Sequence, residues 1–160
     1  MLRIEKSGDY GIDEFAFDGQ YIVYSDCKET NIFKFDRTQL KLKKLTKKVC
    51  AHAGVKKLPS ASVLAIKPAE DEKNEQLVLV TKDLTVLLVD LVTCQTQTLC
   101  SRAVIEEGLG EMTEYDQIVT ASHFNATSNR LVLSFANPKY FCVLDLSSSQ
   151  QNLYWRLPSL

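Results

Sequence analysis

Two histidines and five cysteines are the side chains of this 160-residue chain that could serve as nucleophile, base or zinc ligand. A cysteine nucleophile needs a base, an orienting group and a lowered thiol pKa, and a structural zinc site needs four ligands. Cys50-Ala51-His52 supplies only two ligands, and His123 is expected at or near the core of a strand. We therefore expect no catalytic residue, metal site or cofactor. A small all-β hydrolase that pairs Cys50 or Cys142 with a histidine stays open as an alternative.

Lysines gather in one part of the chain and could neutralise phosphate groups. Positions 34 to 57 hold nine basic residues and one acid, whereas positions 70 to 116 hold eleven acids and three basic residues. Lysines on an exposed strand and the loop after it can contact an RNA backbone without reading its sequence. A solvated surface without a ligand is the other interpretation, and the acidic segment 106–116 could instead dock a basic protein. The RNA-contact candidates are Lys41, Lys43, Lys44, Lys47, Lys48, Lys56 and Lys57.

An aspartate follows an apolar residue at three regularly spaced places. Asp36, Asp90 and Asp145 are separated by 54 and 55 positions. Carboxylates one repeat apart would not share a substrate, whereas an Asp at the end of a strand accepts hydrogen bonds from the backbone of the next turn. The three residues are therefore predicted to be structural turn anchors, and their spacing indicates internal repeats.

Each repeat is predicted to form four β-strands. Runs rich in Val, Ile, Leu, Phe and Tyr alternate with turn signals such as Asp18-Gly19 and Ala136-Asn137-Pro138. Apolar residues do not recur at helical spacing over a dozen positions, so 47–60 and 102–115 are predicted to be loops. The lysine-rich strand 41–45 is expected to be an exposed edge. The predicted strands are 12–17, 21–25, 31–35, 41–45, 61–67, 77–80, 85–89, 95–99, 118–124, 131–135, 141–144 and 153–156.

Three four-stranded units predict an all-β fold of the β-propeller type. Residues 1–160 would form one partial propeller, with blades at about 12–46, 61–100 and 117–157. Propeller rings usually have four to eight blades, and each blade buries its faces against its neighbours. Three blades therefore do not close a ring. We expect the chain to be part of a larger propeller, or to be completed by another copy or another chain.

Composition restricts the compartment more than it restricts the function. A hydrophobic content of 45%, a charged content of 24% and a net charge of -1 are ordinary for a globular protein. An odd number of cysteines without a CxxC pair predicts a reducing compartment. The N-terminal residues lack the apolar run of a secretory signal, and no run has the length of a membrane span. The cytosol or the nucleus is expected, with no membrane partner.

The repeat pattern resembles degenerate WD40 repeats. Phe15-Ala16-Phe17-Asp18-Gly19 stands where that family opens a blade, and Phe35-Asp36, Val89-Asp90 and Leu144-Asp145 stand where it has Trp-Asp. The Trp is replaced each time, and the Gly-His pair expected before the first strand is missing. The order of the segments 18–25, 31–35, 40–45, 119–124, 129–133 and 154–158 further resembles a WD40 tandem-propeller subunit of the small-subunit processome.

This resemblance implies a non-catalytic scaffold of the nucleus and nucleolus that acts in ribosome biogenesis. It would support pre-rRNA transcription, rRNA processing and assembly of the small-subunit processome. Its partners would be other protein subunits of a large ribonucleoprotein complex and pre-ribosomal RNA, with no small-molecule substrate. The alternative keeps the fold and predicts a WD40-like adaptor in ubiquitination, trafficking or signalling, located in the cytosol and binding peptides on a blade face.

Overall fold

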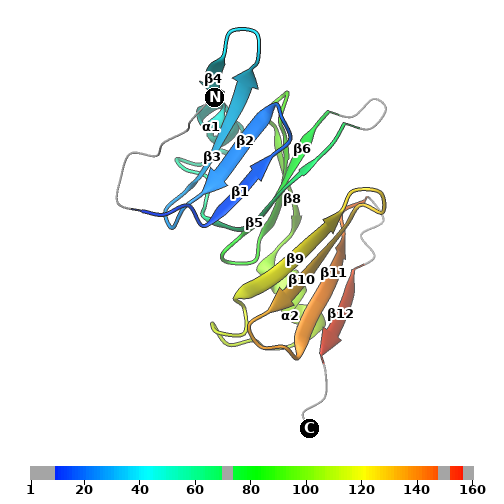
Figure 1. The fold of residues 1–160 in the computed structure, drawn as a ribbon. Coiled ribbons are helices and arrows are strands. Elements are labelled where there is room, and N and C mark those ends of the chain that lie inside the picture. The colour runs from blue at the N-terminus through cyan, green and yellow to red at the C-terminus, as the bar shows by residue number, and fades with distance from the viewer. Residues whose placement is uncertain (1–9, 70–73, 148–151, 157–160) are drawn as a thin grey trace.

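Three antiparallel sheets make up the molecule. The computed structural model describes residues 10–69, 74–147 and 152–156. Within these ranges the chain forms three four-stranded sheets and two short helices (Figure 1). This arrangement confirms the predicted all-β class, and each sheet is a meander whose strands follow one another in sequence order.

The strands lie within two residues of their predicted bounds. Alternating apolar residues and strong turn signals specify both the period and the ends of each strand. The first sheet holds β1 (Glu14–Phe17), β2 (Tyr21–Ser25), β3 (Thr30–Asp36) and β4 (Lys41–Lys44). The second holds β5 (Ala61–Lys67), β6 (Gln76–Thr81), β7 (Val86–Asp90) and β8 (Thr96–Cys100). The third holds β9 (Val119–Asn125), β10 (Arg130–Phe135), β11 (Tyr140–Asp145) and β12 (Leu153–Arg156).

Two segments predicted to be loops are helical instead. The helices α1 (Thr46–Ala53) and α2 (Arg102–Leu109) follow the first and second sheets. Each has eight residues, which is too short for the helical period to emerge over a dozen positions. Their buried residues nevertheless have helical spacing, as Ile105 and Leu109 of α2 illustrate. Gly54 ends α1 with a φ of 68°, a left-handed conformation that favours glycine.

The second sheet is buried on both of its faces. Leu77, Val78, Leu79 and Val80 of β6 are consecutive and all fully buried. Side chains of a strand alternate between the two faces of the sheet. Leu77 and Leu79 accordingly belong to a core shared with the first sheet. Val78 and Val80 belong to a core shared with the third sheet. The second sheet is thus packed between the other two.

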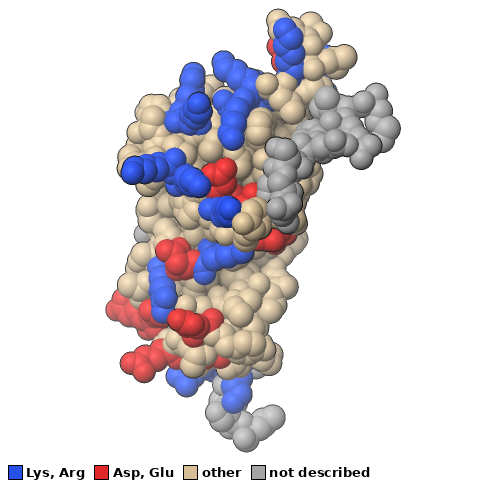
Figure 2. All heavy atoms as spheres, turned by 90° about the vertical axis from the view of Figure 1, so that its left-hand side faces the viewer, with Lys and Arg blue, Asp and Glu red and all other residues tan. Residues whose placement is uncertain are grey.

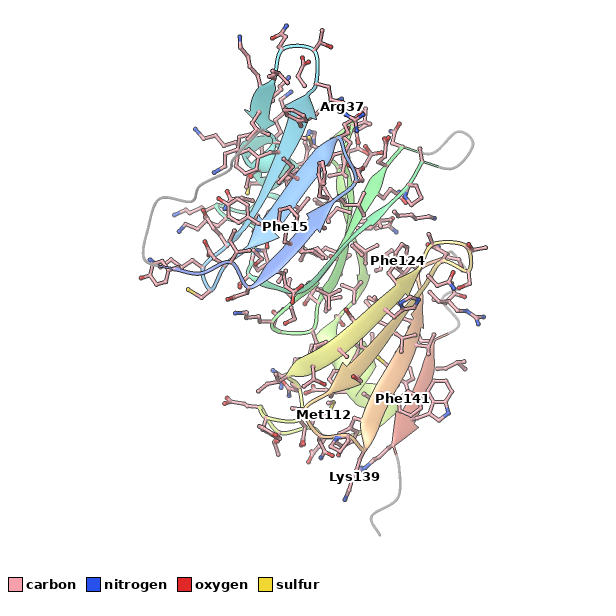
Figure 3. All side chains as sticks on the ribbon, in the orientation of Figure 1. Phe15, Arg37, Met112, Phe124, Lys139 and Phe141 are labelled. Carbon is pink, nitrogen blue, oxygen red and sulfur yellow. The ribbon has the colours of Figure 1, made fainter. Side chains whose placement is uncertain are left out.

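The first and third sheets each bury one face and expose the other. Buried and half-buried residues alternate along β11, so its Cys142 and Leu144 face the core while Phe141 and Val143 do not. Phe15 of β1 is 56% exposed and Trp155 of β12 is 38% exposed. Figure 3 shows Phe15 on the first sheet and Phe141 on the third. We call the face of the first sheet with Phe15 and the face of the third sheet with Trp155 the two end faces.

A buried hydroxyl network connects the first sheet to the second. The side chains of Ser25 and Thr30 are fully buried. Ser25 Oγ accepts a hydrogen bond of 2.8 Å from the backbone N–H of Ala61, the first residue of β5. Thr30 Oγ1 donates a hydrogen bond of 2.7 Å to the carbonyl oxygen of Pro59. These bonds position the first strand of the second sheet against the first sheet.

We expect Ser25→Ala to lower the free energy of unfolding by about 1 to 2 kcal/mol, because it leaves a buried N–H donor at Ala61 without an acceptor. Urea unfolding followed by circular dichroism measures the change. Ser128→Ala is the matched control, because Ser128 is exposed, and it should change stability by less than about 0.5 kcal/mol. Equal midpoints for the two variants would contradict a connecting role for the network.

Candidate nucleic-acid interface

The seven candidate lysines lie on one strand, one helix and one loop. Three are on β4, two are on α1, and Lys56 and Lys57 follow α1. All seven side chains are exposed, and β4 is an exposed edge strand as the sequence predicts. Figure 2 shows Lys and Arg gathered over the upper part of one face, and more Asp and Glu over its lower part. The charge separation along the sequence is therefore also a separation in space.

The hairpin of β3 and β4 sorts the lysines onto two faces of the first sheet. Lys34 pairs directly with Lys43 in the strand register, and Asp36 pairs with Lys41. Residues paired across two strands, and residues two apart along a strand, share a face. Lys44 lies on the opposite face, where its Nζ is 5.7 Å from the centre of the Phe33 ring. The lysines of β4 therefore do not form a single cluster.

A hollow opens beside this hairpin and includes a lysine that the sequence analysis missed. It has a volume of about 670 Å³. Lys34 begins the basic stretch 34–57 but is not among the seven candidates, because it lies seven positions before Lys41 and only the strand register places it opposite Lys43. The alternation of side chains along β3 and the short turn to β4 together indicate the register, and the register identifies Lys34 as the partner of Lys43. The residues that line the hollow are Gln20, Lys34, Phe35, Asp36, Arg37, Gln39, Lys41, Leu42 and Lys43.

Two other lysines differ in their surroundings. Lys57 Nζ lies 3.9 Å from Glu29 Oε2, so part of its charge is balanced by the turn before β3. Lys48 of α1 and Lys43 of β4 both act on the buried thiol of Cys94. Burial raises the pKa of Cys94, and the charges of these two lysines oppose that rise. Lys48 and Lys43 therefore both lie within electrostatic range of the turn that contains Cys94.

The three repeated aspartates hold the turns that follow their strands. Oδ1 of Asp36 and Oδ1 of Asp90 each accept hydrogen bonds of 2.6 to 3.0 Å from the backbone N–H groups two and three residues further on. Asp145 Oδ1 accepts a bond of 2.9 Å from the N–H two residues on. Burial tends to raise the pKa of Asp90, but its hydrogen bonds from Thr93, Asn74 and Val92 outweigh burial and lower the pKa. These hydrogen bonds to the turn backbone give each of the three Asp residues a structural role.

Cys142 and His123 are not placed to act together as nucleophile and base. Burial and the neighbouring Cys100 raise the pKa of the Cys142 thiol to about 12, so it is not a thiolate at neutral pH. The prediction that His123 lies at or near the core is wrong, since its side chain is exposed. His123 pairs with Val132 on the end face of the third sheet, whereas Cys142 faces the core. The pair therefore lies on opposite faces of the sheet.

We expect a maleimide to modify one thiol rapidly in the folded protein. Cys27 is exposed, and the other four cysteines are buried. Those four should react only after unfolding, because the reactive form is an exposed thiolate. Mass spectrometry of timed samples measures the labelling, and Cys27→Ser should remove the rapid phase. Rapid modification of Cys142 would contradict its burial and restore the hydrolase alternative.

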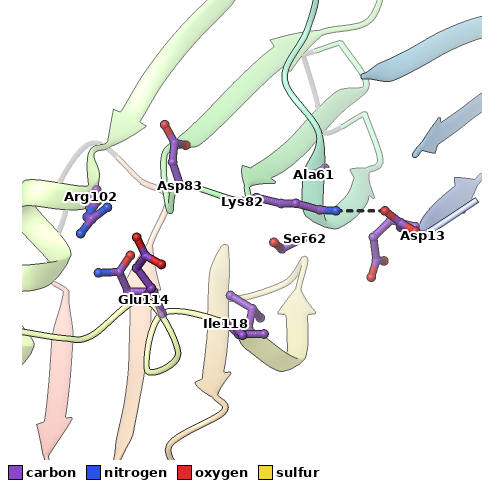
Figure 4. Close-up of a pocket in the computed structure, with 11 residues that line it drawn as sticks. Asp13, Ala61, Ser62, Lys82, Asp83, Arg102, Glu114 and Ile118 are labelled. Atoms are coloured by element: carbon purple, nitrogen blue, oxygen red, sulfur yellow. Dashed lines mark hydrogen bonds and ion pairs between the residues drawn. The ribbon is translucent and has the colours of Figure 1, made fainter. Parts of the chain in front are cut away.

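A second hollow lies where the first strands of the three sheets approach one another (Figure 4). Its volume is about 570 Å³, and its lining includes Glu14, Asp83 and Glu114. Lys82 Nζ contacts Asp13 Oδ2 at 3.0 Å, which links the second sheet to the segment before β1. Burial, followed by the charge of Asp13, raises the pKa of Glu14. Glu14 is thus less easily ionised in the folded protein.

We expect Glu14→Gln to stabilise the protein slightly at neutral pH. Folding raises the pKa of Glu14, so the neutral form of its carboxyl favours the native state. This stabilisation is complete when the pH is below the pKa of the unfolded state, and it is lost as the pH rises through the pKa of the folded state. The variant should therefore unfold at a higher temperature than the wild type at about pH 7, and at a similar temperature near pH 3, where both side chains are neutral. The exposed Glu111→Gln is the control. A destabilised Glu14→Gln variant at neutral pH would contradict this assignment.

Among the residues that the structure describes, no group of three or more His, Cys, Asp or Glu side chains could hold a metal ion. No helix in the same ranges is long and apolar enough to cross a membrane. The sequence matches no protein-family model and no curated protein.

Proposed function

We propose that the chain is part of a WD40-like β-propeller that acts as a non-catalytic scaffold subunit in ribosomal small-subunit biogenesis. One observation carries the architectural part. Three meander sheets stack through apolar faces, and an apolar face remains exposed at each end of the stack. A stack of this kind needs further blades to cover its ends.

The positions of the first strands support this architecture. β1 contacts β5, and β5 contacts β9. The first strand of each sheet therefore lies beside the first strand of the next sheet, as it does around the axis of a propeller. At the opposite side of the first sheet, β4 is an exposed edge. The sheets are thus arranged like neighbouring blades.

The end faces carry aromatic side chains that would suit a blade interface. Phe15 and Phe17 are exposed on the first sheet. On the third sheet, the rings of Phe141 and Trp155 stack with their centres 4.7 Å apart. Aromatic residues bury large areas and dominate interface energetics. These residues are surface-exposed only until another blade packs on them.

Two features support a ribonucleoprotein role rather than catalysis. The order of sequence segments resembles cirhin, a tandem WD40-propeller subunit of the small-subunit processome. The basic surface formed by Lys41 and Lys43 of β4 and by the lysines of α1 offers exposed cations for the phosphates of pre-ribosomal RNA. We propose the nucleolus as the compartment and other processome subunits as the protein partners.

Sedimentation of the tagged natural polypeptide from cells tests this function. We expect it in the fractions that contain pre-ribosomal particles, and we expect its depletion to slow early pre-rRNA processing. A variant with Leu153→Ser and Trp155→Ser should leave these fractions, because it alters an end face. Val92→Ser, which changes an exposed apolar residue outside the end faces, is the control. Absence of the wild-type protein from all particle fractions would refute the proposal.

A second candidate is a WD40-like adaptor in ubiquitination, trafficking or signalling. It is favoured by a hollow of about 410 Å³ at α2, lined by Glu106, Glu107 and Glu111 together with Met112. Carboxylates around an apolar side chain could receive a basic peptide. For such an adaptor, lysine substitutions on β4 would leave partner binding unchanged, whereas Glu107→Lys would weaken it.

A further inference from the structure

We propose that the hollow beside the β3–β4 hairpin binds consecutive phosphates of an RNA strand through Lys34, Lys41 and Lys43. This inference rests on the proposed function for one point, the choice of RNA as the ligand. It goes further in replacing seven dispersed candidates with three residues on one face of one hairpin, and it adds Lys34, which is not among those seven.

The three ammonium groups originate close together. Lys34 and Lys43 are directly opposite each other in the register. Cα atoms of such a pair are about 5.5 Å apart when their backbones exchange hydrogen bonds. Lys41 and Lys43 are two residues apart on β4, which places their Cα atoms roughly 7 Å apart on the same face. This separation is similar to that between successive phosphates of an extended RNA strand.

Like charges directly opposite each other in a sheet are destabilising. Two lysines in this position therefore need an anion or remain a local cost to the fold. Among the residues that the structure describes, no carboxylate forms an ion pair with Lys34, Lys41 or Lys43. Lys34 Nζ instead lies 5.5 Å from the centre of the Tyr21 ring. An external anion would relieve the repulsion between Lys34 and Lys43.

The single acid that lines the hollow is already engaged. Asp36 Oδ1 accepts hydrogen bonds of 2.9 and 3.0 Å from the N–H groups of Thr38 and Gln39. Arg37 is also held in place, since its Nε and Nη2 donate to the carbonyl oxygen of Gly19 at 3.0 and 2.9 Å. Figure 3 shows Arg37 at the hairpin end of β3. The lysines are thus the cations left to meet a ligand.

RNA fits this surface better than an acidic peptide does. Seven of the nine residues that line the hollow are polar or charged, and Phe35 and Leu42 are the two apolar ones. Peptide interfaces depend on a few buried apolar anchors, whereas charged side chains dominate this lining. Binding to a phosphate backbone needs only positioned cations, and lysines supply them without reading sequence. The exposed lysines of α1 extend the same positive surface beyond the hollow.

Fluorescence anisotropy with a labelled, unstructured 20-nucleotide RNA tests the site. The variant Lys34→Gln/Lys41→Gln/Lys43→Gln should bind at least tenfold more weakly than the wild type at about 0.1 M salt. Three lost phosphate contacts should also reduce the slope of log K against log salt by about 2. The matched control is Lys44→Gln/Lys56→Gln/Lys57→Gln, which removes the same charge from the opposite face and from the loop. It should bind within threefold of the wild type.

The outcomes separate this site from the proposed function. Equal weakening in the two triple variants would show a general charge effect and overturn the site. Displacement of RNA by poly-glutamate at the same charge concentration would overturn it in favour of an acidic protein ligand. Wild-type RNA affinity in the hairpin variant would also overturn it, even where the protein sediments with pre-ribosomal particles. Specific loss of RNA affinity without any particle association would support the site and refute the ribosomal function. A cooperative urea transition with a midpoint no lower than that of the wild type establishes that each variant is folded.

Discussion

Leu79→Ala lowers the free energy of unfolding by about 2 to 5 kcal/mol. Leu79 lies at the centre of the second sheet, is fully buried, and belongs to the core shared with the first sheet. Removing its side chain takes away apolar area that folding buries and leaves a cavity between two packed sheets, which relaxes only in part. The loss is a large fraction of the stability of an ordinary domain.

Chemical unfolding followed by fluorescence and by circular dichroism measures this effect. Val104→Ala is the control, because Val104 is on the exposed side of α2, and it should change stability by less than about 1 kcal/mol. If the three sheets form one cooperative stack, both probes report the same lowered midpoint. A loss below 1 kcal/mol for Leu79→Ala would mean that the first and second sheets do not share a tight core.

The burial of Leu79 on one face and Val78 on the other is also where sequence and structure agree most closely. Leu77, Val78, Leu79 and Val80 form a continuous apolar run, which is typical of a strand covered on both faces. Burial alternates along β11, yet its residues Tyr140 to Leu144 also form a continuous apolar run. Apolar runs in the sequence therefore predict the strands, but they do not distinguish the central sheet from an outer one.

The helices were missed for a physical reason. An eight-residue helix has about two turns, and α2 buries only Ile105 and Leu109. Two apolar residues four positions apart are too weak a pattern against a background of acids and glycines. Their helical conformation depends on packing against the sheets, and packing does not appear in a single segment of sequence.

The candidate site was found only in part for a similar reason. Clustering in sequence identified the lysines of β4 and α1, because they are close along the chain. The role of Lys34 depends on which residue lies across the hairpin, and a shift of one residue would move it to the other face. The exposure of His123 likewise depends on which face of the third sheet has a neighbour. Register and stacking order are tertiary information.

Gly108→Ala lowers the free energy of unfolding by about 2 kcal/mol, although the substitution favours a helix. In an isolated helix, alanine would be more stable than glycine by about 1 kcal/mol. Here α2 packs against β12, and a Cβ atom on Gly108 would overlap the ring of Tyr154. Overpacking of this kind costs about 1 to 3 kcal/mol, and sometimes more, because the ring or the helix must shift. The close approach therefore outweighs the helix propensity.

A double-mutant cycle with Tyr154→Leu tests this explanation. Leucine lacks the ring atoms that the new Cβ would meet, so Gly108→Ala should cost less in that background, with a coupling of at least about 0.5 kcal/mol. Gly11→Ala is the matched control, because a Cβ there meets no atom within 4 Å. A stabilised Gly108→Ala variant would show that α2 does not rest on β12 through this glycine. The helix would then be held to the third sheet through Ile105 and Leu109, which belong to the core that the second and third sheets share.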